Sequence, residues 1–192
     1  MTSIAPTRYD RITIVLHWTT AVLVALLWVL GQTADWFPDH GLANVTMWSI
    51  HVVLGFALAA ILVWRILWRT GPGRTLPSAD EGLLHVLAKA THLGLYLLLA
   101  TVVALGIVNA FVRGYSIYGL FHLPELGARA WRRPVTQWHG LAANITLALA
   151  GFHAAAALVH HYVLRDRLVA RMLPWRSSVV VESPVRASAA RH

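Results

Sequence analysis

The chain has 192 residues, of which 57% are hydrophobic and only 12% charged, a balance that excludes an ordinary soluble domain and predicts a membrane protein. The absence of cysteine excludes disulfides, iron–sulfur clusters and haem attached through a C-x-x-C-H motif. A net charge of +8 does not indicate nucleic-acid binding, because the basic residues fall mostly at the ends of apolar segments instead of along one soluble face.

Four apolar segments are long enough to cross a hydrocarbon core, which needs about 20 residues of helix. They run from Ile12 to Gly31, Met47 to Trp68, Leu83 to Val112 and Gln137 to Leu164, with Pro and Gly in every connection. We therefore expect an all-α membrane protein, a four-helix transmembrane bundle formed by residues 1–176. The Ser- and Ala-rich stretch 177–192 has no periodicity and predicts a disordered cytoplasmic tail.

The distribution of positive charge predicts the orientation. With the N-terminus inside, the inner side receives twelve of the sixteen Lys and Arg residues and the outer side four. The positive-inside rule then places both termini in the cytoplasm, as an even number of spans requires. The first segment could instead be a cleaved signal peptide, since Arg8 and Arg11 precede it, but a signal has no need of the pair His17-Trp18.

Four histidines of the apolar segments are the first candidates for cofactor ligands: His17, His51, His139 and His153. His139 and His153 are fourteen residues apart, so they leave one helix face about 21 Å apart along the axis. The topology puts His51 level with His139 near the outer surface and His17 level with His153 nearer the inner one. A single intramembrane histidine often only hydrogen-bonds a neighbouring group. Four at matched depths instead predict axial ligands for two non-covalently held haem groups.

Two further residues belong to the predicted inner half. His92, seven residues after His85 in the third segment, could replace His17 as a ligand. Arg65 lies fourteen residues after His51 and therefore on the same helix face, at the level of the inner pair. It is a candidate partner for a haem propionate, and the alternative is that it extends to the inner membrane surface.

Several motifs resemble the prokaryotic cytochrome b561 family over about residues 8 to 176. They are Leu16-His17-Trp18, Ile50-His51-Val52 with Gly55 and Arg65, Ala90 to Tyr96, Trp138-His139, Gly151 to Tyr162, and Leu173 to Arg176. The resemblance implies a di-haem b protein of the bacterial inner membrane that exchanges electrons with ubiquinone. It also implies that the same four histidines are the ligands, and that the histidine at position 92 is not one. Within this family the chain resembles superoxide oxidases, which oxidise superoxide at the periplasmic side and reduce quinone.

The predicted outer side offers a reason to favour superoxide as substrate. Four arginines lie there and could steer this small anion to the outer haem, or alternatively bind lipid phosphates: Arg113, Arg129, Arg132 and Arg133. We expect an oxidoreductase, a superoxide:ubiquinone oxidoreductase. The alternative is a cytochrome b subunit that conducts electrons for a dehydrogenase or hydrogenase, with the arginines as a docking surface.

Quinone contact is predicted at the inner side. His160 lies only about 20° round the helix from His153 and could hydrogen-bond a quinone carbonyl and deliver a proton. The resemblance points to the same residue, while His161 faces away. His92 is a second candidate to line the quinone pocket. The sequence leaves open a redox partner protein or a homodimer, the quinone type and the reduction potentials.

Overall fold

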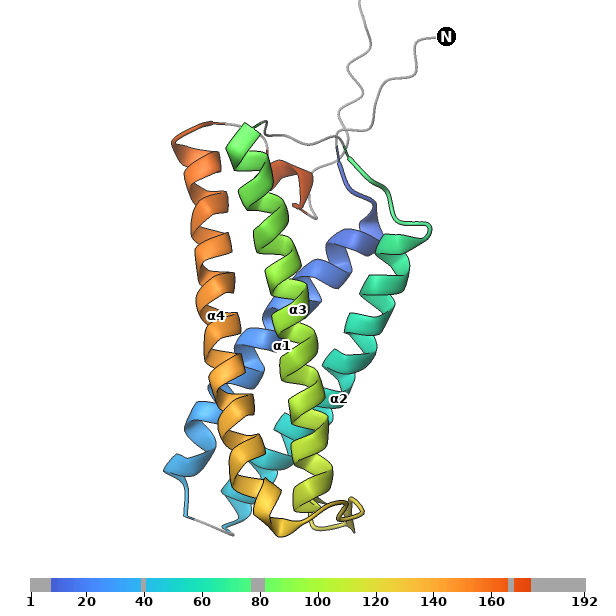
Figure 1. The fold of residues 1–192 in the computed structure, drawn as a ribbon, viewed down its shortest axis with the longest axis vertical. Helices are drawn as coiled ribbons and strands as arrows, with labels where there is room; N and C mark the ends of the chain where they lie inside the picture. Colours follow the sequence, from blue (N-terminus) through green and yellow to red (C-terminus); the bar gives the residue numbers. More distant parts are fainter. Residues whose placement is uncertain (1–7, 39–40, 77–81, 166–167, 174–192) are drawn as a thin grey trace, which may run out of the picture.

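The computed structural model describes residues 8–38, 41–76, 82–165 and 168–173. Its main elements are four long helices, each apolar enough to cross a membrane, which confirms the predicted four-helix, all-α architecture (Figure 1). They are α1 (Arg11–Thr33), α2 (Leu42–Thr70), α3 (Gly82–Arg113) and α4 (Arg132–Tyr162). Helices α2 and α4 begin one to two turns before the predicted Met47 and Gln137, because polar residues that the hydropathy pattern assigned to loops continue the helix.

Minor elements occupy the connections between the helices. They are the short helices η1 (Ala34–Trp36), η2 (Arg129–Trp131) and η3 (Val169–Arg171), and a two-stranded antiparallel sheet of β1 (Ser116–Ile117) and β2 (Phe121–His122). We call the end of the bundle that holds the α1–α2 connection and this sheet the loop end. The opposite end, where α1 begins and η3 lies, is the terminal end, drawn at the top of Figure 1.

The helices pack as two close pairs, α1 with α2 and α3 with α4. Toward the terminal end α2 diverges from α3 (Figure 1). An apolar layer in the middle of the bundle, formed by Leu27, Leu58, Leu62 and Leu99, joins three of the helices. Many other large apolar side chains face outward, as in a helix that contacts lipid, and these include Val22, Leu97 and Phe152. The bundle therefore has only a small interior core.

Asp10 fastens α1 to α2 at the terminal end. Its carboxylate caps α1 by accepting from the Thr13 N–H at 2.9 Å, and it also accepts from the Trp68 indole at 3.0 Å and the Arg74 N–H at 3.0 Å. Partial burial raises the pKa of this carboxyl, but the hydrogen bonds outweigh it and the resulting pKa is about 2. Asp10 is therefore ionised throughout the physiological range.

Two segments that the sequence did not predict close the ends of the bundle. At the loop end, the fully buried Ser49 hydroxyl accepts from the Tyr118 N–H at 2.8 Å and so holds the β1–β2 hairpin against α2. At the terminal end, the segment 168–173 returns to α1, where the Trp18 indole donates to the Met172 carbonyl at 2.9 Å. The predicted domain boundary at residue 176 and the tail 177–192 lie outside the described residues.

Candidate cofactor sites

The four histidines of the transmembrane segments form two facing pairs, one in each half of the bundle. At the loop end His51 on α2 faces His139 on α4, with ring centroids 6.2 Å apart. At the terminal end His17 on α1 and His153 on α4 are 6.4 Å apart. Two imidazoles on opposite sides of one metal, each with a nitrogen about 2 Å from it, have their ring centroids about 6 Å apart. Both separations therefore leave room for one metal ion.

Each ring of the loop-end pair is fixed by its surroundings. His139 Nδ1 lies 3.0 Å from the Val102 carbonyl, so Nδ1–H donates and Nε2 is left without a proton, the form that binds a metal. His51 Nδ1 is buried without a hydrogen bond of good geometry in the described part of the chain, but its ring interacts with the Leu27 backbone of α1. Glycines lie behind both rings: a Cβ at Gly106 would come within 3.0 Å of His139 Cε1, and one at Gly31 within 3.4 Å of His51 Cε1.

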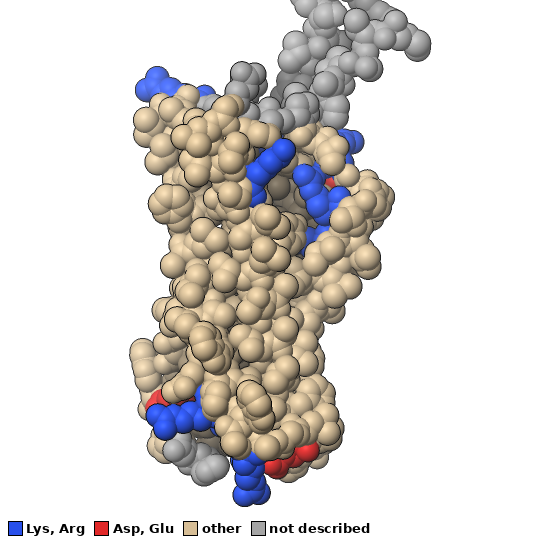
Figure 2. Space-filling view, in the orientation of Figure 1, with Lys and Arg blue, Asp and Glu red and all other residues tan. Residues whose placement is uncertain are grey.

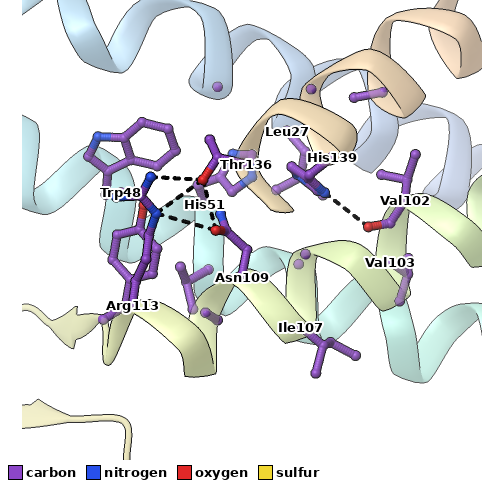
Figure 3. A pocket seen from close by; sticks show the side chains of 18 of the residues that line it. Leu27, Trp48, His51, Val102, Val103, Ile107, Asn109, Arg113, Thr136 and His139 are labelled. Carbon is purple, nitrogen blue, oxygen red and sulfur yellow. Dashed lines mark hydrogen bonds between the residues drawn. The ribbon is translucent and has the colours of Figure 1, made fainter. Parts of the chain in front are cut away.

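A cavity of about 700 Å³ surrounds the loop-end pair and is lined by all four helices (Figure 3). This volume lies within the range of about 300–1,000 Å³ common for cofactor and ligand sites. Beside the two histidines, Gly55 and Gly140 leave open space, because a Cβ at either would meet no atom within 4 Å. The wall is apolar toward the middle of the bundle and polar toward the loop end, where it includes Asn44, Asn109, Arg113, Arg132 and Thr136. These features fit haem, a flat apolar ring with two carboxylates at one edge.

A cation accompanies the pair at the terminal end. Arg65 points toward it: Nη2 is 3.1 Å from His17 Nδ1, and Nε donates to the Tyr96 hydroxyl at 3.0 Å. The guanidinium also lies over the Tyr96 ring, 5.3 Å from its centroid. Among the described residues, no carboxylate oxygen lies within 4 Å of Arg65. A half-buried cation with only neutral partners is available to an anion that enters this site.

Both His17 and His92 lie beside His153 at the terminal end. The ring centroids of His92 and His153 are 5.2 Å apart, about an ångström less than two imidazoles on opposite sides of one metal ion require. His17, at 6.4 Å, meets the requirement. His92 therefore lies beside the pair as a neighbour on α3. His160 is half-buried near the end of α4, and His161 packs edge-on against Tyr162 with centroids 4.8 Å apart.

The four loop-end arginines occupy different environments. Arg132 is paired with Glu125, with Nη2 2.6 Å from Oε1, and Arg129 Nε lies 3.7 Å from the same oxygen. Arg113 and Arg132 line the cavity, whereas the side chain of Arg129 is 83% exposed and Arg133 is exposed. Figure 2 shows Lys and Arg gathered at the two ends of the molecule and none across its middle on this face. The charge distribution is that of a chain whose middle lies in lipid.

Three features of the sites had not been predicted. Tyr96 orients Arg65, Asn109 and Thr136 hold Arg113, and Gly31 and Gly106 accommodate the histidine rings. A signal existed for part of this, because Asn109 precedes Arg113 by one helical turn and can reach it. The contacts that join different helices could not be predicted, because no periodicity within one helix indicates them.

Four apolar helices with an imidazole pair in each half define a multi-pass membrane protein of the electron-transfer class. Residues 8–175 match the family described as prokaryotic cytochrome b561, and the chain belongs to this family. Membership implies haem b as the cofactor and membrane electron transfer as the activity.

Curated relatives align over nearly their whole length. The chain is 32% identical to a probable superoxide oxidase, CybB, of Yersinia pestis, with 87% of this chain and 96% of the relative covered. It is 33% identical to cytochrome b562 of Cereibacter sphaeroides, with 86% and 94% covered. It is 31% identical to cytochrome b561 homolog 2 of Escherichia coli K12, with 90% and 95% covered. No solved structure matches the chain.

Proposed function

We propose that the chain holds two haem b groups and transfers electrons from superoxide at the loop end to ubiquinone at the terminal end. One haem lies between His51 and His139 and the other between His17 and His153. The observation that carries this proposal is the pair of ring separations, 6.2 and 6.4 Å, in opposite halves of one bundle. Haem held by two imidazoles supplies one-electron transfer without an open iron position for oxygen.

The arrangement of the chain keeps the two half-reactions apart. His139 and His153 are separated by about 21 Å along α4. The apolar layer of Leu27, Leu58, Leu62 and Leu99 fills the bundle between the two sites and excludes water and ions from it. Superoxide and protons are therefore confined to opposite ends.

Superoxide is collected by the cationic loop end. Arg132 lines the cavity wall, and the exposed Arg129 and Arg133 raise the potential around its mouth. Glu125 offsets part of this charge, since it pairs with both Arg129 and Arg132. Two superoxide ions each lose one electron and leave as dioxygen, while one ubiquinone gains the two electrons and two protons. A curated relative named as a probable superoxide oxidase supports this choice of donor.

Quinone is reduced at the terminal end, which we place on the cytoplasmic side of the bacterial inner membrane. The positive-inside rule supports this orientation, because the terminal end carries Arg8, Arg11, Arg69, Arg74 and Lys89. His160 hydrogen-bonds a quinone carbonyl and supplies a proton from that side, and His92 lines the same pocket.

A pulse of superoxide to the purified, haem-loaded protein tests the proposal. We expect the haem absorbance to change to that of the reduced form without any added protein. Changing Arg129, Arg132 and Arg133 together to Gln should slow this reduction about tenfold. A matched control removes three positive charges from the terminal end, at Arg11, Arg69 and Lys89, and should leave the rate of haem reduction by superoxide unchanged.

The competing function is that of an electron conduit for a partner dehydrogenase or hydrogenase. The loop end also exposes apolar side chains suited to docking: Leu120 is 86% exposed, Trp131 61% and Phe121 55%. If superoxide leaves the haems oxidised and only a partner enzyme reduces them, the conduit is correct and the superoxide proposal is wrong. Equal rates for the loop-end variant and its control would refute the role of the three arginines.

A further inference from the structure

Arg113, the last residue of α3, is held inside the loop-end cavity by neutral side chains. Its Nε and Nη2 donate to the Thr136 hydroxyl at 3.1 and 2.8 Å, and Nε also approaches Asn109 Oδ1 at 3.3 Å. The Thr136 hydroxyl lies 2.9 Å from the same Asn109 oxygen, so the three side chains form one network (Figure 3). The network fixes the guanidinium between α3 and α4.

The charge of Arg113 is not neutralised by the protein. Among the described residues, no carboxylate oxygen lies within 4 Å of it, whereas Arg129 and Arg132 both reach Glu125. A guanidinium has five N–H donors, and the Thr136 and Asn109 oxygens engage only those on Nε and Nη2. A half-buried guanidinium whose remaining N–H groups have no acceptor costs free energy in a cavity, unless a bound anion accepts their hydrogen bonds.

The polarity of the cavity indicates where a carboxylate would lie. Toward the middle of the bundle the lining residues include Leu27, Leu58 and Leu99, which offer a carboxylate no hydrogen bond. At the loop end, Asp35 also lines the cavity and would repel a second anion. The α3–α4 wall with Arg113 is therefore the favourable place for a propionate.

The terminal-end site has the same design. Arg65 is half-buried, lacks a carboxylate partner in the described part of the chain, and is oriented by a neutral hydroxyl, that of Tyr96. Arg65 is near one histidine pair, and Arg113 lines the cavity of the other. Each proposed haem would thus have one arginine for its acidic edge.

We propose that Arg113 binds a propionate of the loop-end haem and is a positioning residue for that cofactor, separate from the arginines that collect superoxide. The inference rests on the proposed haem binding but not on superoxide as the donor. Because a nearby positive charge favours the reduced haem, loss of Arg113 should make this haem harder to reduce. It should also speed haem loss, since one anchor of the cofactor is gone.

Redox titration and transfer of haem to an excess of an apo haem-binding protein test the proposal. In Arg113→Gln we expect the ferric-to-ferrous ratio of one haem to rise about tenfold at fixed potential, a shift of about 59 mV for one electron. Transfer of that haem should be about tenfold faster than in wild type, a rate change equivalent to about 1.4 kcal/mol. The second haem should keep its potential.

Three variants separate the inference from simpler explanations. Arg113→Lys keeps the charge and should shift the potential less than Arg113→Gln, while Thr136→Val should give a partial shift because the guanidinium loses its support. Arg129→Gln removes an exposed charge from the same end and should leave both potentials unchanged. If Arg113→Gln does not fold, the potentials of the other three variants test the inference. It predicts a shift in Arg113→Lys and in Thr136→Val, and none in Arg129→Gln.

Two outcomes would overturn the inference. Unchanged potential and haem transfer in Arg113→Gln would show that no propionate depends on this residue. An equal shift in Arg129→Gln would assign the effect to the general field of the loop end. A wild-type chain that binds no haem would instead refute the proposed function itself, so the two failures are distinguishable.

Discussion

Replacing Gly106 by alanine tests whether the His139 ring lies where the structure places it. The added Cβ would be 3.0 Å from His139 Cε1 and 3.4 Å from Nδ1. Carbon atoms pack best at about 3.5–4.0 Å, so the ring must move by about 0.5–1 Å or α3 and α4 must separate. Metal–ligand distances tolerate only about 0.2 Å. We therefore expect Gly106→Ala to lose most of the loop-end haem and to keep the terminal-end haem.

The energetic balance makes this effect selective. Alanine stabilises a helix by up to about 1 kcal/mol relative to glycine, while overpacking costs about 1–3 kcal/mol. Folding should therefore change little, and the loss should appear in haem content. Gly151→Ala on α4 is the matched control, because its Cβ would meet no atom within 4 Å. Gly31→Ala, at 3.4 Å from His51, should give a smaller loss. Haem content comes from pyridine haemochrome spectra, and full occupancy in Gly106→Ala would refute the reasoning.

Four further predictions concern the histidines, the charged loop end and the start of α1. His51→Ala or His139→Ala should remove the loop-end haem, and His17→Ala or His153→Ala the terminal-end haem. His92→Ala should retain both haems, and haem loss in that variant would make His92 a ligand in place of His17. The rate of haem reduction by superoxide should fall as salt increases, because exposed charges are screened over about 8 Å at physiological ionic strength, and a salt-independent rate would contradict steering. For Asp10, the pKa falls from 3.8 to about 2 on folding, so its stabilising contribution is complete above about pH 4 and is lost as pH falls toward 2. Thermal unfolding in detergent should show this loss in wild type and a weaker pH dependence in Asp10→Asn.

The fold and the histidine pairs were accessible from the sequence because they depend on regular helical geometry. Hydropathy located four spans, and fourteen residues of helix place His139 and His153 on one face whatever the rest of the chain does. The same arithmetic placed Arg65 near the terminal-end pair, where it contacts His17. The direction in which a side chain leaves a helix depends only on its position along that helix, so it can be predicted without knowing the rest of the fold.

The supporting contacts were not accessible because they join distant parts of the chain. Nothing in the pattern near Trp18 indicates that its indole meets the Met172 carbonyl. Pairing of Glu125 with two of the four predicted steering arginines depends on the path of the connection before α4. The β1–β2 hairpin forms from residues 116–122, which are too few to give an alternating strand pattern.

The most direct test of the whole account is the yield of ubiquinol per superoxide consumed by the haem-loaded protein, measured with ubiquinone present and corrected for spontaneous dismutation. Each superoxide ion supplies one electron and ubiquinone accepts two. The account predicts one ubiquinol for every two superoxide ions, and no ubiquinol with the His51→Ala variant. Ubiquinol formation that persists in His51→Ala, or its absence in wild type carrying both haems, would contradict the account.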